Sequence, residues 1–93
     1  MSDKVVEHTL CEPFRGTGDR EISTVRMRRI KAKDMRAMSE ASDDEMAQAL
    51  WLIGRLSGLS PDEVDEMDAA DVAALTDIIE GFQKPAAPRK PTD

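Results

Sequence analysis

Aromatic residues and cysteine are scarce in this chain of 93 residues, which has one Cys, one Trp, two Phe and no Tyr. A single Cys excludes an intramolecular disulfide and is typical of a reducing compartment. With so few rings, aliphatic side chains and six Met must fill the core. Met is flexible and adapts to irregular neighbours, so it suits both an adaptable core and an adaptable binding surface.

Long apolar runs are missing as well. No stretch approaches the roughly 18 residues of a transmembrane helix, and Met1-Ser2-Asp3-Lys4 leads into no signal-peptide core. We therefore expect a soluble, cytoplasmic protein. A chain of this length forms one domain, which buries only about 60–65% of the surface that its unfolded state exposes.

Charges of opposite sign are segregated along the chain. Six basic residues stand against one acidic residue from Arg26 to Arg36, and twelve acidic residues stand against one basic residue from Glu40 to Glu80. The net charge of −6 hides this division. Either the two segments lie near each other in the fold, or each meets a different partner. The acidic half argues against a nucleic acid partner, because it would repel a phosphate backbone.

The order of local patterns predicts an α+β fold that begins with a β-hairpin. The segments from Val5 to Leu10 and from Glu21 to about Arg29 are rich in β-branched residues, and Pro13 and the turn Gly16-Thr17-Gly18 separate them. Apolar residues do not alternate cleanly in the second segment, which indicates a bulge or a two-sided strand. Two strands are not stable alone, so helices must back the hairpin.

A bundle of three to four short helices is predicted to follow. The first spans about 32–39 with Met35 and Met38 pointing inward. A capping box at Ser42-Asp43-Asp44-Glu45 opens the second, which runs to about residue 57 and stops at Gly58. Apolar residues at spacings of three and four predict its inward face, formed by Met46, Ala49, Leu50 and Ile53.

Two helix starts then follow each other closely. Ser60-Pro61-Asp62-Glu63 is a capping box with Pro at the first helical position, and it opens a helix of about two turns. Asp68 is the predicted N-cap of a last helix over about 69–82, and Asp71 adds negative charge to its first turn. One face of this helix carries the apolar residues Val72, Leu75, Ile79 and Phe82.

The C-terminal residues differ in composition from the rest. Residues 84–93 contain three of the five Pro residues and no large apolar side chain apart from Pro. Such a segment cannot bury enough apolar surface to order itself. We therefore expect one folded domain over residues 4–83 and a disordered, flexible tail over 84–93.

Candidate catalytic and metal-binding residues are few. His8 and Cys11 are a conventional base and nucleophile, but three positions apart on a strand they are expected on opposite faces, and no third member of a triad is identifiable. They supply two zinc ligands where three or four are needed. Gly16-Thr17-Gly18 lacks the flanking residues of a phosphate loop. The carboxylates from Asp62 to Asp68 lack the spacing of a calcium loop and are expected to form a solvated helix face. We predict no catalytic residue, metal or cofactor, and hence no enzyme.

Partner binding is better supported, because the helix over 45–57 has apolar residues on more than one face. Trp51 and Leu52 project away from its predicted inward face, and Arg55 lies one turn after Trp51. One interpretation is a central helix that is buried all round. The other is that Trp51 and Leu52 form an exposed anchor for a partner helix. The candidate partner-binding residues are Trp51, Leu52, Arg55 and Met46.

Several short motifs occur together in the order seen in one known family. They are Leu10-x-x-Pro13, a Gly-containing turn, a strand that ends in Arg28-Arg29-Ile30-Lys31-Ala32-Lys33-Asp34, and Leu56-Ser57-Gly58-Leu59-Ser60 followed by Val64, Met67-Asp68, Asp71 and Phe82. In this order the chain resembles, over about residues 5–83, the small tail assembly chaperones of contractile-tailed (Mu-like) phages. Ile30 stands where the family pattern has Pro, so we expect a less rigid corner between strand and helix.

The resemblance implies a non-enzymatic protein that binds the tape measure protein, a long helical chain that is prone to aggregate, and keeps it soluble during tail assembly. It also implies a gene just before that of the tape measure protein and absence from the finished virion. A programmed frameshift would give a second, longer product in which the segment from Lys84 onward is replaced. This longer form is a further expected partner, and no membrane or cofactor is implied.

Two other classes of function stay open. A small nucleic-acid-binding regulator would use the basic segment from Arg26 to Arg36 to contact phosphates. The same positive charge would also protect an exposed strand edge from aggregation. A minor structural tail or head-joining protein is the other alternative, and it would be present in purified particles.

Overall fold

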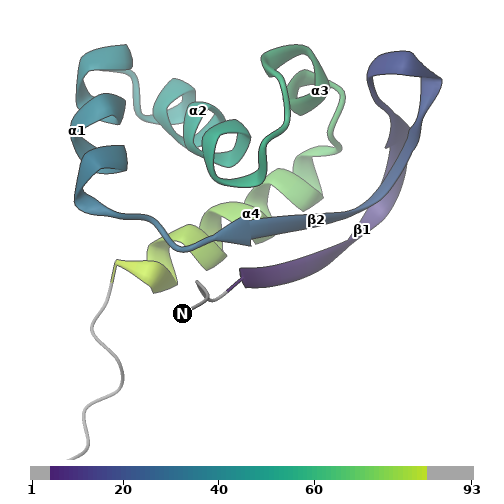
Figure 1. The fold of residues 1–93 in the computed structure, drawn as a ribbon, viewed down its shortest axis with the longest axis horizontal. Coiled ribbons are helices and arrows are strands. Elements are labelled where there is room, and N and C mark those ends of the chain that lie inside the picture. Colours follow the sequence, from purple (N-terminus) through teal and green to yellow (C-terminus); the bar gives the residue numbers. More distant parts are fainter. Residues whose placement is uncertain (1–4, 84–93) are drawn as a thin grey trace, which may run out of the picture.

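A two-stranded antiparallel hairpin forms the N-terminal part of the fold. In the computed structural model, which describes residues 5–83, β1 spans Val5–Arg15 and β2 spans Glu21–Arg28, with a short 3-10 turn over Thr17–Asp19 between them (Figure 1). The predicted hairpin is confirmed. β1 is longer than the predicted segment from Val5 to Leu10, because a shift in pairing accommodates Pro13 and its neighbours within the strand.

This shift also explains the broken alternation in β2. Thr9 pairs with Thr24 and Phe14 with Ile22, so four residues of β1 lie opposite a single residue of β2. Ile22, Val25 and Met27 of β2 are all buried, although no strict period of two relates them. The expected bulge is therefore present, and its extra residues belong to β1.

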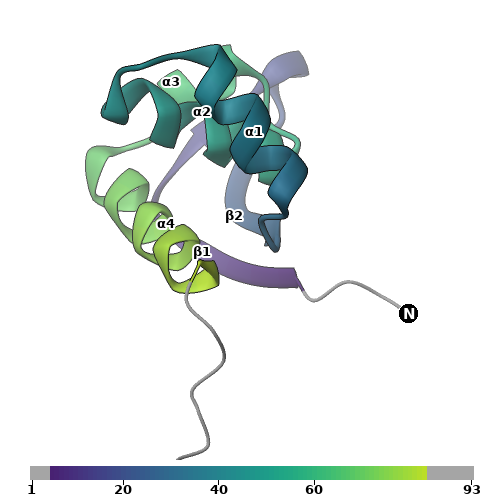
Figure 2. The ribbon, with the colours of Figure 1, turned by 90° about the vertical axis from the view of Figure 1, so that its left-hand side faces the viewer.

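Four helices complete the α+β fold that the sequence predicts. They are α1 (Ala32–Ala41), α2 (Glu45–Ser57), α3 (Pro61–Asp65) and α4 (Ala69–Phe82). Figures 1 and 2 show α1, α2 and α3 grouped together on one side of the hairpin, while α4 packs along β1. The hairpin is thus backed by helices from both ends of the helical part of the chain.

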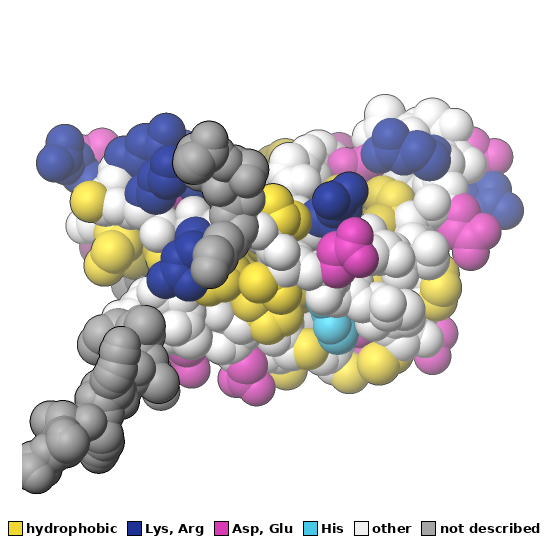
Figure 3. Space-filling view, turned by 60° about the horizontal axis from the view of Figure 1, so that its bottom comes forward, with side chains coloured by type: hydrophobic (Ala, Val, Ile, Leu, Met, Phe, Trp, Pro, Cys, Tyr) yellow, Lys and Arg dark blue, Asp and Glu magenta, His cyan; other side chains and the backbone are white. Residues whose placement is uncertain are grey.

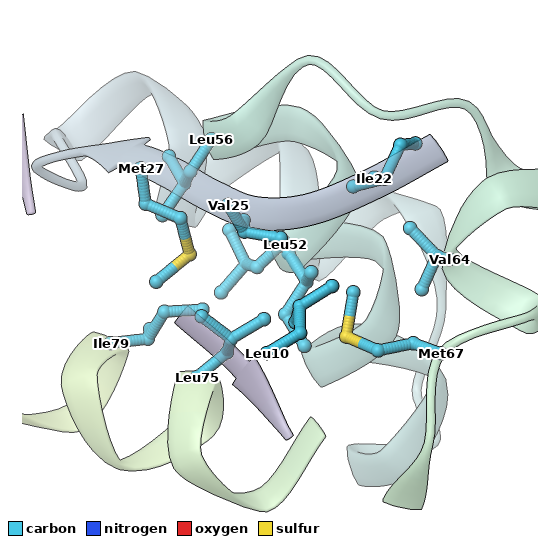
Figure 4. Close-up of a cluster of buried hydrophobic side chains, with 11 residues drawn as sticks. Leu10, Ile22, Val25, Met27, Leu52, Leu56, Val64, Met67, Leu75 and Ile79 are labelled. Atoms are coloured by element: carbon cyan, nitrogen blue, oxygen red, sulfur yellow. The ribbon is translucent and has the colours of Figure 1, made fainter. Parts of the chain in front are cut away.

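The core is aliphatic and lies between the hairpin, α2 and α4. Side chains from both strands and from three helices point to a common centre (Figure 4). Met27, Ile53 and Leu75 have no exposed surface at all. The core residues are Leu10, Ile22, Val25, Met27, Leu52, Ile53, Leu56, Val64, Met67, Leu75 and Ile79.

Both closely spaced helix starts form as predicted. The Ser60 Oγ accepts a hydrogen bond from the Glu63 N–H at 3.2 Å, and the Glu63 Oε1 accepts one from the Ser60 N–H at 3.0 Å. The Asp68 side chain accepts from the Ala70 N–H at 2.9 Å. α3 has only five residues and falls short of the predicted two turns, because the chain must become extended again at the N-cap of α4.

The start of α2 differs from the prediction. Its N-cap is Asp44, whose carboxylate accepts a hydrogen bond from the Ala47 N–H at 2.8 Å. Ser42 instead ends α1, and its Oγ accepts from the Asp44 N–H at 3.0 Å. The Asp carboxylate lies nearer the helix and competes for its first N–H groups. The predicted stop is confirmed, because Gly58 has a φ of 83°, a left-handed conformation that favours glycine.

Two predicted inward faces are correct only in part, since Ile53 is buried as predicted and Met38 and Leu50 pack against the core. On α1, Met35 is 44% exposed and the buried residue is Asp34, while Met38 is half-buried. On α2 the buried residues are Leu52, Ile53 and Leu56, whereas Met46 is 62% exposed. α2 is apolar on two faces, and the hairpin covers the face that carries Leu52 and Leu56. Periodicity alone did not distinguish the two faces of this helix.

The predicted tail over 84–93 and the first residue of the predicted domain, residue 4, lie outside the described residues.

Candidate functional site

A groove with a volume of about 1040 Å³ lies between α2 and α4. We call it the α2–α4 groove. Met67 and Val64 close one side of its floor, and Met46 lies at its edge on α2. Its apolar lining includes Met46, Leu50, Leu52, Val64, Met67, Val72 and Ile79. An apolar groove between two helices is a common site for a partner helix.

Carboxylates surround this apolar floor. Glu45 on α2, Asp65 on α3, and Asp77 and Glu80 on α4 line the α2–α4 groove and are exposed. Among the described residues that line it, none is Lys or Arg. The groove therefore presents apolar surface within a negative rim, and a partner with positive charge beside its apolar side chains would complement it.

A second, smaller groove of about 470 Å³ lies between α2 and α3. We call it the α2–α3 groove. Trp51 and Arg55 line its α2 side, and Leu59 and Pro61 line its α3 side. The guanidinium of Arg55 lies over the Trp51 ring, 5.2 Å from its centroid. Such stacking is a cation–π contact that helps to hold the ring in place. The two grooves share the lining residues Leu50, Val64 and Asp65.

The four candidate partner-binding residues divide between the two grooves. Met46 is exposed at the edge of the α2–α4 groove, and Leu52 lies in its floor with only 3% of its surface exposed. Leu52 is therefore not the exposed anchor that the sequence suggested, because the hairpin covers its side of α2. Trp51 is half-buried and lies with Arg55 in the α2–α3 groove. Their role in partner binding stays a prediction.

Arg55 also holds a buried carboxylate. The Asp34 side chain is completely buried and accepts two hydrogen bonds from Arg28, at 2.8 and 2.9 Å, and one from the Arg55 Nε at 2.6 Å. It also accepts from the Lys31 N–H at 2.8 Å. The Arg28 hydrogen bonds lower the pKa of Asp34 most, burial opposes them, and Arg55 and the Lys31 N–H add to them, so the pKa lies well below its usual range. Asp34 thus links two parts of the fold: the corner that follows β2, through Arg28 and Lys31, and helix α2, through Arg55.

A second buried carboxylate joins α4 to β1. Asp71 Oδ1 accepts from the His8 Nε2 at 3.0 Å and from the Cys11 N–H at 2.8 Å, and Oδ2 accepts from the Glu12 N–H at 3.2 Å. Burial raises the pKa of Asp71, but the hydrogen bonds from Cys11, His8 and Glu12 outweigh it, so the pKa lies below its usual value. The Cys11 and Glu12 N–H groups belong to the bulged part of β1, where strand pairing is interrupted.

His8 and Cys11 are not on opposite faces as predicted, since the bulge brings both to Asp71. The hydrogen bond and negative charge of Asp71 raise the pKa of the Cys11 thiol. A nucleophilic thiol needs a lowered pKa instead. In a catalytic triad, moreover, the His lies between the acid and the nucleophile, whereas here Asp71 touches both. The cluster holds β1 in place and does not form an activated nucleophile.

The third buried carboxylate, Glu63, holds the hairpin loop. Glu63 Oε2 accepts from the Thr17 N–H at 2.7 Å and lies 3.6 Å from a guanidinium nitrogen of Arg20. Hydrogen bonds from the Ser60 and Thr17 N–H groups lower the pKa of Glu63 to about 2, with burial opposing them. The glycine turn predicted at Gly16-Thr17-Gly18 is therefore a structural contact with α3.

Neither the acidic residues nor the basic segment forms an obvious ligand site. Within residues 5–83, no group of three or more His, Cys, Asp or Glu residues is arranged to hold a metal ion. In the basic segment, Arg26 pairs with Glu7 at 3.2 Å, and Arg29 donates to the Phe82 carbonyl at 3.1 Å. Figure 3 shows one face of the molecule, and Lys and Arg side chains gather at its left end. Nucleic acid binding by this segment stays a prediction.

The sequence reasoning missed the α4 wall of the groove and the three buried carboxylates. One signal was present for Asp71, which lies four residues before Leu75 and thus in phase with the apolar face of α4. A charged residue at a core position is rarely buried unless it is paired, so this position predicts a specific partner. No comparable signal existed for the groove, because Thr76, Asp77 and Glu80 look like an ordinary solvated face.

In the described part of the chain, no helix is long and apolar enough to cross a membrane. The fold and the site define a small α+β protein with two adjacent apolar grooves, and the larger of them has carboxylates at its rim. The chain belongs to the family of phage tail assembly chaperone proteins, described as E, or 41 or 14, whose model matches residues 7–84. Comparison with curated proteins and with solved structures found no match.

Proposed function

We propose that this protein binds the tape measure protein of a contractile-tailed phage and keeps it soluble until the tail is assembled. The observation that carries the proposal is the pair of adjacent apolar grooves along α2 in a member of the tail assembly chaperone family. A long amphipathic client exposes apolar stripes before assembly, and such grooves cover them reversibly.

The composition of the grooves suits this task. Met46 and Met67 line the α2–α4 groove, and Met side chains adapt to apolar partners of different shape. The acidic rim of the α2–α4 groove keeps the complex hydrated and repels other negatively charged chaperone molecules. We further propose that the protein acts in the host cytoplasm, that it is absent from the virion, and that a frameshifted longer form shares this domain.

Co-expression with the tape measure protein of the same genome tests the proposal. We expect the long chain to appear in the soluble fraction and to copurify with the chaperone at about 0.15 M salt, where charges more than about 8 Å apart are largely screened from each other. If the long chain precipitates equally with and without this protein, the proposed function is wrong. Finding stoichiometric amounts of this chain in purified particles would instead favour a structural tail protein.

Trp51→Ala examines the smaller groove in the same assay. Trp51 is only half-buried, so we expect the variant to stay folded with a loss of about 1–2 kcal/mol in unfolding free energy. We also expect less soluble client, because Trp is a frequent binding anchor. Circular dichroism melts of the isolated variant separate the two effects. A variant that folds and solubilises the client as well as the wild type would remove Trp51 from the binding surface.

A further inference from the structure

The α2–α4 groove has the dimensions of a helix-binding site. α4 forms one wall along its 14 residues, which corresponds to about 21 Å of helix. The opposite wall is formed by α2 residues between Glu45 and Leu52, with Met46 exposed at its edge. A helix lying in such a groove contacts both walls through residues at i, i+3, i+4 and i+7.

The charges of the groove specify what kind of helix fits. Glu45, Asp65, Asp77 and Glu80 form the rim, and no ion pair within the described residues 5–83 neutralises them. A bound helix with acidic flanks would bring like charges together, which weakens binding. A helix with Lys or Arg beside its apolar stripe would turn the same rim into a source of specificity.

We propose that the α2–α4 groove binds a single amphipathic helix whose apolar stripe is flanked by Lys and Arg residues. The inference rests on the proposed function, because it assumes that this helix is a segment of the client. It adds a rule for where on the client the chaperone binds, namely stripes with basic flanks rather than every apolar stripe.

A second copy of this chain is a poorer occupant. The large apolar side chains that are exposed in the described residues are Val5, Met35 and Met46, and each lies on a different element. α1 has basic residues beside Met35, but a single Met does not provide a stripe that fills a groove of about 1040 Å³. The groove therefore fits a foreign helix better than any described helix of its own fold.

Peptide binding tests the inference without the client. The probe is a synthetic amphipathic peptide of about 18 residues, roughly 27 Å long as a helix, with a Leu stripe flanked by Lys and a fluorescent label. Its twin carries Glu in place of every Lys. By fluorescence anisotropy at about 0.15 M salt, we expect the Lys peptide to bind at least about tenfold more tightly than the Glu peptide. Equal binding of both peptides, or none, would overturn the inference.

Matched variants locate the binding site. Met46 and Met35 are both exposed, but only Met46 lines the groove. We expect Met46→Asp to weaken binding of the Lys peptide at least about fivefold and Met35→Asp to leave it unchanged. The double variant Asp77→Lys, Glu80→Lys should abolish the preference between the two peptides, because its two Lys residues offset the remaining Glu45 and Asp65, whereas Glu40→Lys, Asp43→Lys, outside the groove, should leave the preference unchanged. All six substituted positions are exposed, so folding is not at risk. Equal effects of Met46→Asp and Met35→Asp would contradict the proposed location.

The outcomes separate this inference from the proposed function. If the wild type solubilises the tape measure protein but Met46→Asp and the double rim variant do so equally well, the function stands and the groove is not its site. If the Lys peptide binds as expected but the tape measure protein stays insoluble, the groove is correct and the proposed client is wrong. If Met46→Asp dissolves a self-associated form in light scattering and the Lys peptide does not compete with it, the occupant is a second copy and the inference fails.

Discussion

Buried carboxylates account for much of the specificity of this fold at the scale of single residues. Asp34, Glu63 and Asp71 each accept backbone N–H groups that the local secondary structure leaves unsatisfied. Each carboxylate comes from a helix and binds the hairpin, its loop or the corner that follows it. Removing such an acceptor leaves buried donors without partners, which costs more than the hydrogen bond itself contributes.

Asp71→Asn should destabilise the protein by about 1–3 kcal/mol. The amide keeps one acceptor oxygen but places an NH₂ group near donors of β1, in a site with no access to water. Urea denaturation followed by circular dichroism measures the change. Asp77→Asn on the exposed face of the same helix should stay within about 0.5 kcal/mol of the wild type. Equal stability of the two variants would show that Asp71 does not hold β1.

Gly16→Ala should destabilise the protein by about 1–3 kcal/mol, because of a close approach and not because of its backbone angles. A Cβ atom at residue 16 would lie 2.5 Å from both Glu63 Oε2 and Ile22 Cδ1. Gly81→Ala on α4 meets nothing within 4 Å and should stabilise the helix by up to about 1 kcal/mol. Thermal melts of both variants check these opposite signs, and a Gly16→Ala variant as stable as the wild type would refute the close approach.

At the scale of elements, helix starts and stops were predictable because they depend on residues three or four positions apart. The starts at Ser60 and Asp68, the stop at Gly58 and the hairpin all formed as the sequence indicates. Inward faces were less predictable. α2 has two apolar faces, and which one is buried depends on where the hairpin lies. Met46, which was expected inside, is therefore exposed, and Leu52, for which the sequence left both environments open, is buried.

Ser60→Ala should lower the unfolding free energy by about 1 kcal/mol, since its Oγ caps α3 through the Glu63 N–H. The short α3 carries Val64 into the core, so loosening it also affects packing. Ser39→Ala replaces an exposed serine inside α1 and should change stability by a few tenths of a kcal/mol at most. Chemical denaturation measures the unfolding free energy of both variants, and equal losses would show that the cap does not contribute to stability.

At the scale of the whole molecule, the sequence predicted the fold class but not the two grooves. The grooves are formed by residues of α2, α3 and α4 that come together only in the folded protein. The sequence singled out Trp51 and Met46, which line the grooves, because large apolar residues are conspicuous on a helix. The rim carboxylates Asp77 and Glu80 were not, because nothing in a single helix distinguishes a groove edge from a solvated face.

Stability should fall in acid. The folded pKa of Glu63 is about 2 against an ordinary value of 4.5, so its contribution is fully present above about pH 4.5 and is lost as the pH falls toward 2. Asp34 and Asp71 have lowered pKa values and act in the same direction. Denaturation at several pH values across this range should show that the unfolding free energy of Glu63→Gln changes less with pH than that of the wild type. Glu40→Gln, at an exposed carboxylate, is the control, and an identical pH dependence for all three proteins would contradict the prediction.

The pairing of β1 with α4 has a consequence for synthesis on the ribosome. His8 and Cys11 are translated early, yet their acceptor on Asp71 lies 63 and 60 residues further along the chain. A nascent chain that ends before residue 69 also lacks Leu75 and Ile79, so its first strand has neither its apolar cover nor its acceptors. Among the described elements, the hairpin is therefore translated before the helices and gains its contacts with α4 only at the end, and the α2–α4 groove exists only after that point.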